Sequence, residues 1–269
     1  SDELDLKGYY SLPEQPPHSL VIIVHGIGEH SGRFNDLIDF LAQNGYATAG
    51  FDLRGHGESQ GRRGHINRWS DYRNDLNRFV QQLPKAITSL PSFLYGHSLG
   101  ALIVIDALIS QDHPPFKGAL LSGIPIESAA EKNAIKRNLA IILSNIWPTL
   151  QLKVGISRQQ LSRDVNALSA HREDPLTHGW GTVRWAYETL QAIRRIRTQA
   201  NEISLPLLVM HGSADPVAKE AGAKQLFDQF GSSDKTFISY PGALHEPHND
   251  ICSKQVFKDI ISWFNRTYK

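Results

Sequence analysis

Two serines stand between glycines in a pattern that can expose a nucleophilic hydroxyl group. Gly-x-Ser-x-Gly occurs once around Ser59 and once around Ser98. The pattern indicates a catalytic serine only where a strand leads into a sharp turn and a helix follows, because that turn exposes the hydroxyl group. The apolar segment Phe93–Tyr95 precedes Ser98 and a long apolar segment follows it, whereas glycines and arginines follow Ser59. We therefore interpret Ser98 as a nucleophile and the Ser59 segment as a scaffold loop.

A serine hydroxyl needs a base to take its proton and an acid to orient that base. On the strand-turn-helix pattern, the chain order is serine, acid, histidine. Asp215 lies just beyond the apolar segment Leu205–Met210, and His245 lies just beyond Thr236–Tyr240. Both positions fall at the carboxyl ends of expected parallel strands, which is where open α/β sheets place ligands. The sequence therefore predicts Asp215 as the acid and His245 as the base.

Other assignments remain open at this point. Asp215 could serve as a turn or N-cap residue, and Glu127 is then the second candidate for the acid. His248 is the reserve base. His245 and His248 also suggest a metal pair, but His-Glu-Pro-His lacks the spacing of His-Glu-x-x-His, so we expect neither a metal nor another cofactor.

An oxyanion needs two backbone N–H donors, one after the nucleophile and one in the loop after an early strand. Leu99 supplies the first donor, and the segment His25–Gly28 supplies the second, which we place at Ile27. The alternative is that His25–Gly28 is simply a tight turn.

Apolar segments of strand length alternate with helical periods along most of the chain. The expected strands are 20–24, 46–53, 93–95, 119–126, 205–210 and 236–240. The expected helices are 34–41, 72–79, 99–109, 223–230 and 256–264. The strands lack polar alternation, which is typical of a parallel sheet buried on both faces. We predict an α/β fold with a mostly parallel central sheet flanked by helices.

One region, 127–189, breaks this alternation. It shows no strand signal and is too long for an ordinary connection. Apolar residues at helical spacing occupy its first part: Ile135, Leu139, Ile142, Leu143 and Ile146. The sequence therefore predicts a core formed by 1–126 and 190–269, interrupted by a helical cap insertion at 127–189.

Composition narrows the classes of partner and compartment. The 269 residues carry 28 Lys and Arg against 27 Asp and Glu, so a net charge of +1 provides no long-range attraction for nucleic acid. Cys252 is the only cysteine, which excludes internal disulfides and cysteine-rich zinc sites. No segment approaches the ~20 apolar residues that a spanning helix needs. We expect a cytoplasmic or peripheral membrane protein that binds no nucleic acid.

Four motifs together resemble the monoacylglycerol lipase and lysophospholipase-like branch of the α/β-hydrolases. They are His25-Gly26-Ile27-Gly28-Glu29-His30-Ser31-Gly32-Arg33-Phe34, Asp52-Leu53-Arg54-Gly55-His56-Gly57-Glu58-Ser59, Gly96-His97-Ser98-Leu99-Gly100 and His211-Gly212-Ser213-Ala214-Asp215. The resemblance covers nearly the whole chain and extends to Asp174-Pro175-Leu176 in the insertion. It implies the same triad and oxyanion residues, with a cap over an acyl pocket. The chain departs from the family where Leu99-Gly100-Ala101 replaces Met-Gly-Gly and Ile27 replaces alanine.

These observations predict a metal-free serine hydrolase that cleaves single-chain lipid esters, most of all monoacylglycerols. The alternatives are a lysophospholipase, a broad carboxylesterase, or a ligand-binding receptor built on the same scaffold. Apolar residues Leu139–Leu143, Ile146 and Trp147 near Lys132, Lys136 and Arg137 also suggest a helix that contacts a membrane surface. The alternative is that this stripe packs on its own domain.

Overall fold

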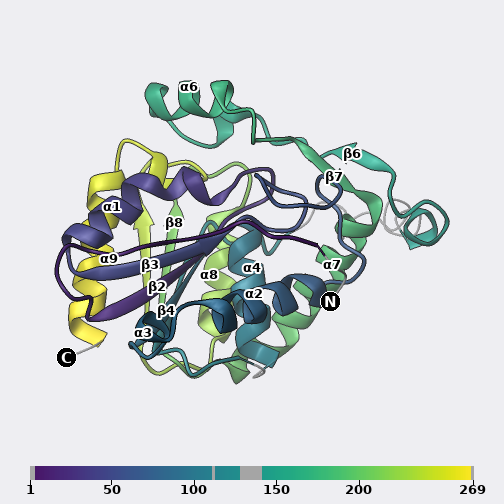
Figure 1. The fold of residues 1–269 in the computed structure, drawn as a ribbon. Helices are drawn as coiled ribbons and strands as arrows, with labels where there is room; N and C mark the ends of the chain where they lie inside the picture. Colours follow the sequence, from purple (N-terminus) through teal and green to yellow (C-terminus); the bar gives the residue numbers. More distant parts are fainter. Residues whose placement is uncertain (1–3, 111–112, 128–140, 268–269) are drawn as a thin grey trace.

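A seven-stranded sheet forms the centre of the molecule in the computed structural model, which describes residues 4–110, 113–127 and 141–267. The strands lie in the order β1-β3-β2-β4-β5-β8-β9 (Figure 1). Their bounds are β1 Gly8–Ser11, β2 Ser19–Val24, β3 Tyr46–Phe51, β4 Ser92–His97, β5 Gly118–Ser122, β8 Leu207–Gly212 and β9 Lys235–Tyr240. Only β1 is antiparallel to its neighbour. The predicted mostly parallel sheet is confirmed.

The inner strands are buried on both faces, which is why their sequences show no polar alternation. All six residues of β2 are buried. Leu20 and Ile22 belong to the apolar cluster on one face, and Val21 and Ile23 belong to the cluster on the other. Each face therefore needs its own layer of helices.

Helices cover both faces of the sheet. The core helices are α1 Asn35–Gln43, α2 Ser70–Gln82, α3 Lys85–Thr88, α4 Leu99–Ser110, α7 Val183–Gln199, α8 Glu220–Gln229 and α9 Ser253–Thr267. Buried residues of α1 and α9 join the cluster around Val21, and those of α2, α4, α7 and α8 join the cluster around Leu20. α4 packs against both the sheet and α7, which explains why its sequence is apolar on nearly every side.

Residues 141–182, here called the cap segment, lie along one side of the α/β core (Figure 1). They contain a helical turn at 141–146, then β6 Gln151–Lys153, η2 Arg158–Gln160, α6 Val165–Glu173 and β7 Trp180–Thr182. β6 and β7 form an antiparallel pair, so the expectation that 127–189 contains no strand was wrong. Strands of three residues are too short to show a period of two.

The predicted boundary between 189 and 190 falls inside α7, which packs on α4 of the core. The division into 1–126, 127–189 and 190–269 therefore stays a prediction. Part of the apolar and basic pattern expected in the insertion, Lys132, Ile135, Lys136, Arg137, Leu139 and Ala140, lies outside the described residues. Within the described ranges, no helix is long and apolar enough to span a membrane.

Candidate active site

Ser98 occupies a strained turn between β4 and α4. Its backbone φ of 51° is positive, and it is the only non-glycine residue with that geometry in the described part of the chain. The flanking glycines make the turn possible. A Cβ on Gly96 would lie 2.6 Å from the Gly100 carbonyl oxygen, and a Cβ on Gly100 would overlap the Val24 carbonyl oxygen. This is the strand-turn-helix context that the sequence pattern predicted.

A continuous chain of hydrogen bonds joins the three predicted side chains. His245 Nε2 lies 2.9 Å from Ser98 Oγ, and His245 Nδ1 lies 2.7 Å from Asp215 Oδ2. With the imidazole proton on Nδ1, the serine hydroxyl donates to His245 and His245 donates to Asp215. All three side chains are buried, so water does not compete strongly for these bonds.

Asp215 is held as a carboxylate by its neighbours. Burial opposes its ionisation, but hydrogen bonds with His211 and His245 and the Ala218 amide outweigh burial and keep its pKa well below the usual range. The Val217 and Ala218 amides donate to Oδ1 at 2.8 and 2.9 Å, which leaves Oδ2 for the histidine. Asp215 is therefore charged throughout the neutral pH range.

Two backbone amides near Ser98 are free to bind an oxyanion. Among the described residues, no protein acceptor is bonded to the N–H of Leu99 or of Ile27. Contacts on both sides hold the Ile27 loop in place: Leu53 N donates to His25 Nε2 at 2.9 Å, and His178 N donates to Gly28 O at 2.8 Å. The second contact comes from the cap segment.

The alternative candidates lie elsewhere. Glu127 contacts the position of Gly222 in α8, while His245 already pairs with Asp215. His248 is buried, stacks on Phe34 with ring centroids 4.6 Å apart, and has no hydrogen-bond partner for either ring nitrogen in the described structure. Burial lowers the pKa of His248 to about 4.

Ser59 braces the loop in which it lies. Its hydroxyl donates to the Asp52 carbonyl oxygen at 2.5 Å and accepts from Lys7 N at 2.8 Å. These bonds give the Ser59 segment the scaffold role that the sequence indicated.

Three charged residues at this site, the buried Glu29 and Glu246 and the partly buried Arg33, had no role predicted from the sequence. Arg33 Nη2 donates to Glu246 Oε2 at 2.7 Å, and Arg33 Nε lies 3.4 Å from Glu29 Oε2. Glu246 follows His245 directly, and Glu29 follows the oxyanion loop. Arg33 and Glu246 are more than 200 residues apart in the sequence, so no local spacing predicts that they pair. The position of these three charged residues beside glycine-rich motifs was the available signal.

Ser98 opens into a cavity of about 380 Å³ between the core and the cap segment. Ile27, Ser98 and His245 line its core side. The cap segment lines the other side with the apolar Val154, Ile156 and Leu161 and with polar residues that include Arg158 and His178. The described residues contain no group of three or more His, Cys, Asp or Glu placed to hold a metal ion. The arrangement suits nucleophilic attack on a carbonyl group in a cavity lined by both apolar and polar side chains.

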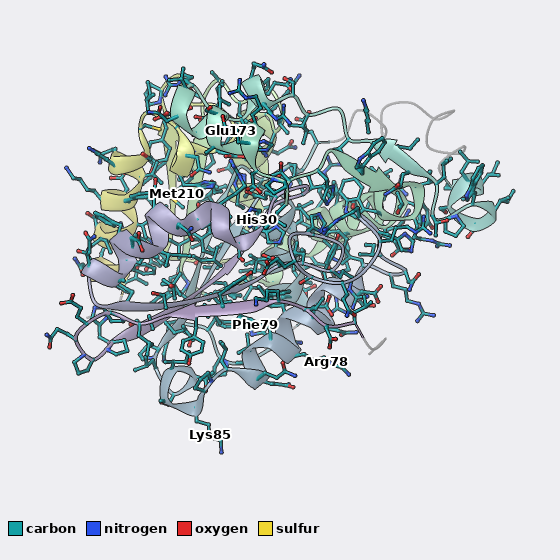
Figure 2. All side chains as sticks on the ribbon, turned by 45° about the horizontal axis from the view of Figure 1, so that its top comes forward. His30, Arg78, Phe79, Lys85, Glu173 and Met210 are labelled. Atoms are coloured by element: carbon teal, nitrogen blue, oxygen red, sulfur yellow. The ribbon has the colours of Figure 1, made fainter. Side chains whose placement is uncertain are left out.

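Hydrogen bonds connect the cap segment to the catalytic loops. Glu246 N donates to Leu161 O at 2.8 Å, and Arg163 Nε donates to Asp250 Oδ1 at 2.9 Å. On the opposite side, His30 Nε2 lies 2.6 Å from Asp174 Oδ2. Figure 2 shows Glu173, at the end of α6, above His30 of the core. The cap segment therefore bonds both to the loop that carries His245 and to the residue that follows Glu29.

Comparison with known proteins identifies the family. Residues 15–251 match the family model described as serine aminopeptidase, S33. Monoglyceride lipase of Homo sapiens is 30% identical over 262 residues, which are 96% of this chain and 86% of that protein. An uncharacterized abhydrolase domain-containing protein of Dictyostelium discoideum is 28% identical over 93% of this chain, which spans only 27% of that longer protein.

Comparison with solved structures points to the same kind of protein as comparison with sequences. The crystal structure of Paleococcus ferrophilus monoacylglycerol lipase superposes with a TM-score of 0.88 at 29% identity, covering 98% of this chain and 99% of that one. The match extends through core and cap segment alike, and the family model spans most of the sequence. The chain therefore belongs to the serine aminopeptidase S33 family of α/β-hydrolases and is similar to its monoglyceride lipases.

Proposed function

We propose that this protein is a serine ester hydrolase that cleaves monoacylglycerols through an acyl-enzyme intermediate. The proposal rests on the hydrogen-bonded series Ser98, His245 and Asp215 at the wall of the cavity. The two backbone amides that lack a protein acceptor among the described residues lie beside the same serine. The monoacylglycerol substrate is inferred from the similar lipases, and Val154, Ile156 and Leu161 of the cap segment offer apolar contacts for an acyl chain.

In the first half-reaction, Ser98 Oγ attacks the ester carbonyl carbon while His245 Nε2 takes the hydroxyl proton. The carbonyl oxygen becomes an anion that accepts hydrogen bonds from the Ile27 and Leu99 amides. Asp215 stabilises the imidazolium and keeps the ring in the required tautomer. His245 then protonates the glycerol oxygen as the carbon–oxygen bond breaks, and the acyl group stays on Ser98.

In the second half-reaction, water replaces glycerol beside His245. The imidazole removes a proton from that water, which attacks the acyl carbonyl, and the oxyanion returns to the same two amides. Collapse of this intermediate releases the fatty acid and returns the proton to Ser98. Each group thus acts twice, and the balanced reaction is ester plus water giving acid plus alcohol.

The family description includes aminopeptidases, but the carboxylates in this cavity do not favour that activity. An aminopeptidase needs an anionic group to bind the substrate's α-ammonium. Glu29 and Glu246 line the cavity, yet Arg33 lies between them and pairs with both. Neither carboxylate is left as an open anionic anchor, so an ester substrate without a positive charge fits better.

We further propose that the cap segment contacts the lipid surface from which the substrate comes. Apart from Val165 at the start of α6, its exposed large apolar residues are Ile142, Ile146, Trp147, Leu152 and Trp180. All lie in the helical turn at 141–146 or close to the β6–β7 pair, which Figure 1 shows at one end of the molecule. Lys153 Nζ lies 5.9 Å from the Trp180 ring, so a cation accompanies the apolar side chains.

Substitution of the nucleophile tests the activity directly. We expect Ser98→Ala to lower kcat/KM for a monoacylglycerol by at least about 10⁴-fold, because loss of a triad member removes nucleophilic catalysis. A fluorophosphonate probe should label the wild-type protein and not the variant. If the variant retains most activity, the mechanism is wrong, and if the wild-type protein neither reacts nor turns over, a receptor role is favoured.

A substrate panel separates the candidate activities. We expect monoacylglycerol to be cleaved faster than lysophosphatidylcholine, short-chain nitrophenyl esters or an amino-acid nitroanilide. A preference for lysophosphatidylcholine would make the protein a lysophospholipase, and uniform rates on the esters would make it a broad carboxylesterase. Cleavage of the nitroanilide above all would instead support an aminopeptidase.

A further inference from the structure

The oxyanion loop is held by a buried carboxyl group to which the mechanism above gives no role. We propose that Glu29 is a positioning residue: it fixes the Gly26 amide and so aims the Ile27 N–H at the reacting carbonyl oxygen. The inference rests on the proposed function, since it assigns Glu29 a part in the same reaction.

The first contact is the hydrogen bond from Gly26 N to Glu29 Oε1, at 2.6 Å. It closes the loop on itself across three residues. A Cβ built on Gly26 would lie 2.7 Å from Glu29 Oε1 and 3.1 Å from the Cβ of Ser98. Gly26 therefore lies between the Glu29 carboxyl and the nucleophile, with no space for a side chain.

The second contact fixes the other end of Gly26. Its carbonyl oxygen lies 2.8 Å from His25 Nδ1. The Gly26 carbonyl and the Ile27 N–H belong to one planar trans peptide group, so they point in opposite directions. Holding Gly26 N with Glu29 and Gly26 O with His25 thus sets the direction of the Ile27 N–H, which itself has no protein acceptor among the described residues.

Glu29 is in turn held by Arg33. The guanidinium lies beside Glu29 through Nε and donates to Glu246 through Nη2. Glu29 and Glu246 are both almost fully buried. Since Glu246 follows His245 directly in the chain, this series runs from the oxyanion loop to the loop of the catalytic base.

The charge of Glu29 suits its place beside a developing anion. Burial and the neighbouring Glu246 raise the pKa of Glu29, although Arg33 opposes them. Burial also opposes ionisation of Glu246, but Arg33 and His248 outweigh it and lower its pKa. Glu246 is thus the carboxylate that balances Arg33, and Glu29 is the neutral member of the pair at neutral pH. A neutral Glu29 still accepts the Gly26 hydrogen bond without repelling the oxyanion.

The other titratable groups around Glu29 change little across the weakly alkaline range. Burial lowers the pKa of His97 and of His248, and raises that of Tyr95. The pKa of Arg33 is raised by its two carboxylate neighbours despite burial. Ionisation of Glu29 is therefore the change expected near the oxyanion loop as pH rises, and it places a negative charge against the transition state.

Two variants test the role with a short-chain nitrophenyl ester, a substrate that needs only Ser98 chemistry. Glu29→Ala removes the acceptor, and we expect kcat to fall about 10- to 100-fold with KM within about twofold, because the lost interaction matters only in the transition state. Glu29→Gln keeps an acceptor oxygen and should restore kcat to within about threefold at pH 7. Glu202→Ala, at an exposed glutamate away from the cavity, is the matched control and should match the wild type.

The pH dependence gives a readout that a purely structural role would not change. In the wild-type protein, kcat should decline on the alkaline side as Glu29 ionises. In Glu29→Gln that decline should disappear, because the carboxamide cannot ionise. This comparison stands even if Glu29→Ala does not fold.

Three results would overturn the proposal. They are an unchanged kcat in Glu29→Ala, an effect on KM alone, and an alkaline decline that is the same in Glu29→Gln as in the wild type. Failure of the proposed function looks different, since the wild-type protein would then show no turnover that depends on Ser98.

Discussion

Ser98 combines a reactive position with an unfavourable backbone. Its φ of 51° costs an L-amino acid roughly 1–2 kcal/mol, and glycine escapes that cost. We therefore expect Ser98→Gly to be about 1 kcal/mol more stable than Ser98→Ala in urea unfolding, with both variants inactive. A glycine variant is usually less stable than the alanine variant at the same position, so the reversed order of stability would indicate backbone strain at Ser98.

Ser239, an exposed residue within β9, is the matched control because its backbone has no positive φ. There, Ser239→Ala should be the more stable variant. If alanine is also the more stable residue at position 98, the turn stores no strain and its geometry has another cause.

Also at the residue scale, the site residues that could be predicted were those marked by a local sequence pattern. Ser98, Asp215 and His245 each follow an apolar strand segment, so a local pattern was enough to select them, and the structure brings them within hydrogen-bond reach. Glu29 and Glu246 act through Arg33, which pairs residues from opposite ends of the chain. The i,i+4 spacing of Glu29 and Arg33 is local, but no local pattern encodes the contact between Arg33 and Glu246.

At the scale of elements, the six long strands were predictable from their apolar segments and α1, α2, α4, α8 and α9 from their apolar residues, whereas α3 and α7 were not predicted. β1, β6 and β7 were not predicted. β1 is an edge strand with mostly exposed residues, β6 is three exposed residues, and β7 is three residues of which only two are buried, so none shows a recognisable buried face. Hydrophobic periodicity detects burial that repeats along a strand, and these three strands are too exposed or too short to show it.

One buried charge on α4 joins three helices. Asp106 is fully buried and pairs with Arg73 of α2 and Arg195 of α7. We expect Asp106→Ala to lower the free energy of unfolding by about 2–3 kcal/mol, below the usual cost of breaking a buried pair because both arginines reach solvent. Asp106→Asn, which keeps an acceptor oxygen, should lie between the alanine variant and the wild type.

Thermal or urea unfolding measures this order. The control is Glu173→Ala, which removes an exposed ion pair with Arg172 and should leave stability unchanged. Equal stability of Asp106→Ala and Glu173→Ala would show that the buried cluster does not hold the three helices together.

At the scale of the whole molecule, the catalytic residues and the exposed apolar residues proposed to contact lipid lie on different segments that meet at one cavity. The core supplies Ser98 and His245, and the cap segment supplies the other side of the cavity together with the exposed apolar residues beyond it. A monoacylglycerol leaving a lipid surface that the cap segment contacts would then have a short path to the nucleophile. Binding to lipid and hydrolysis of a soluble ester should therefore be separable by mutation.

The double variant Ile146→Ser/Trp147→Ser tests this separation. These side chains are 76% and 58% exposed, so their replacement should leave folding intact. We expect at least about tenfold weaker binding to phospholipid vesicles in a sedimentation assay, because each apolar side chain lost from a lipid contact costs of the order of 1 kcal/mol or more. Turnover of monoacylglycerol presented in vesicles should fall with binding, while hydrolysis of a short-chain nitrophenyl ester stays at the wild-type rate. Ile251→Ser, at an exposed residue of the core, should change neither, and equal vesicle binding by the double variant and the wild type would contradict contact through the cap segment.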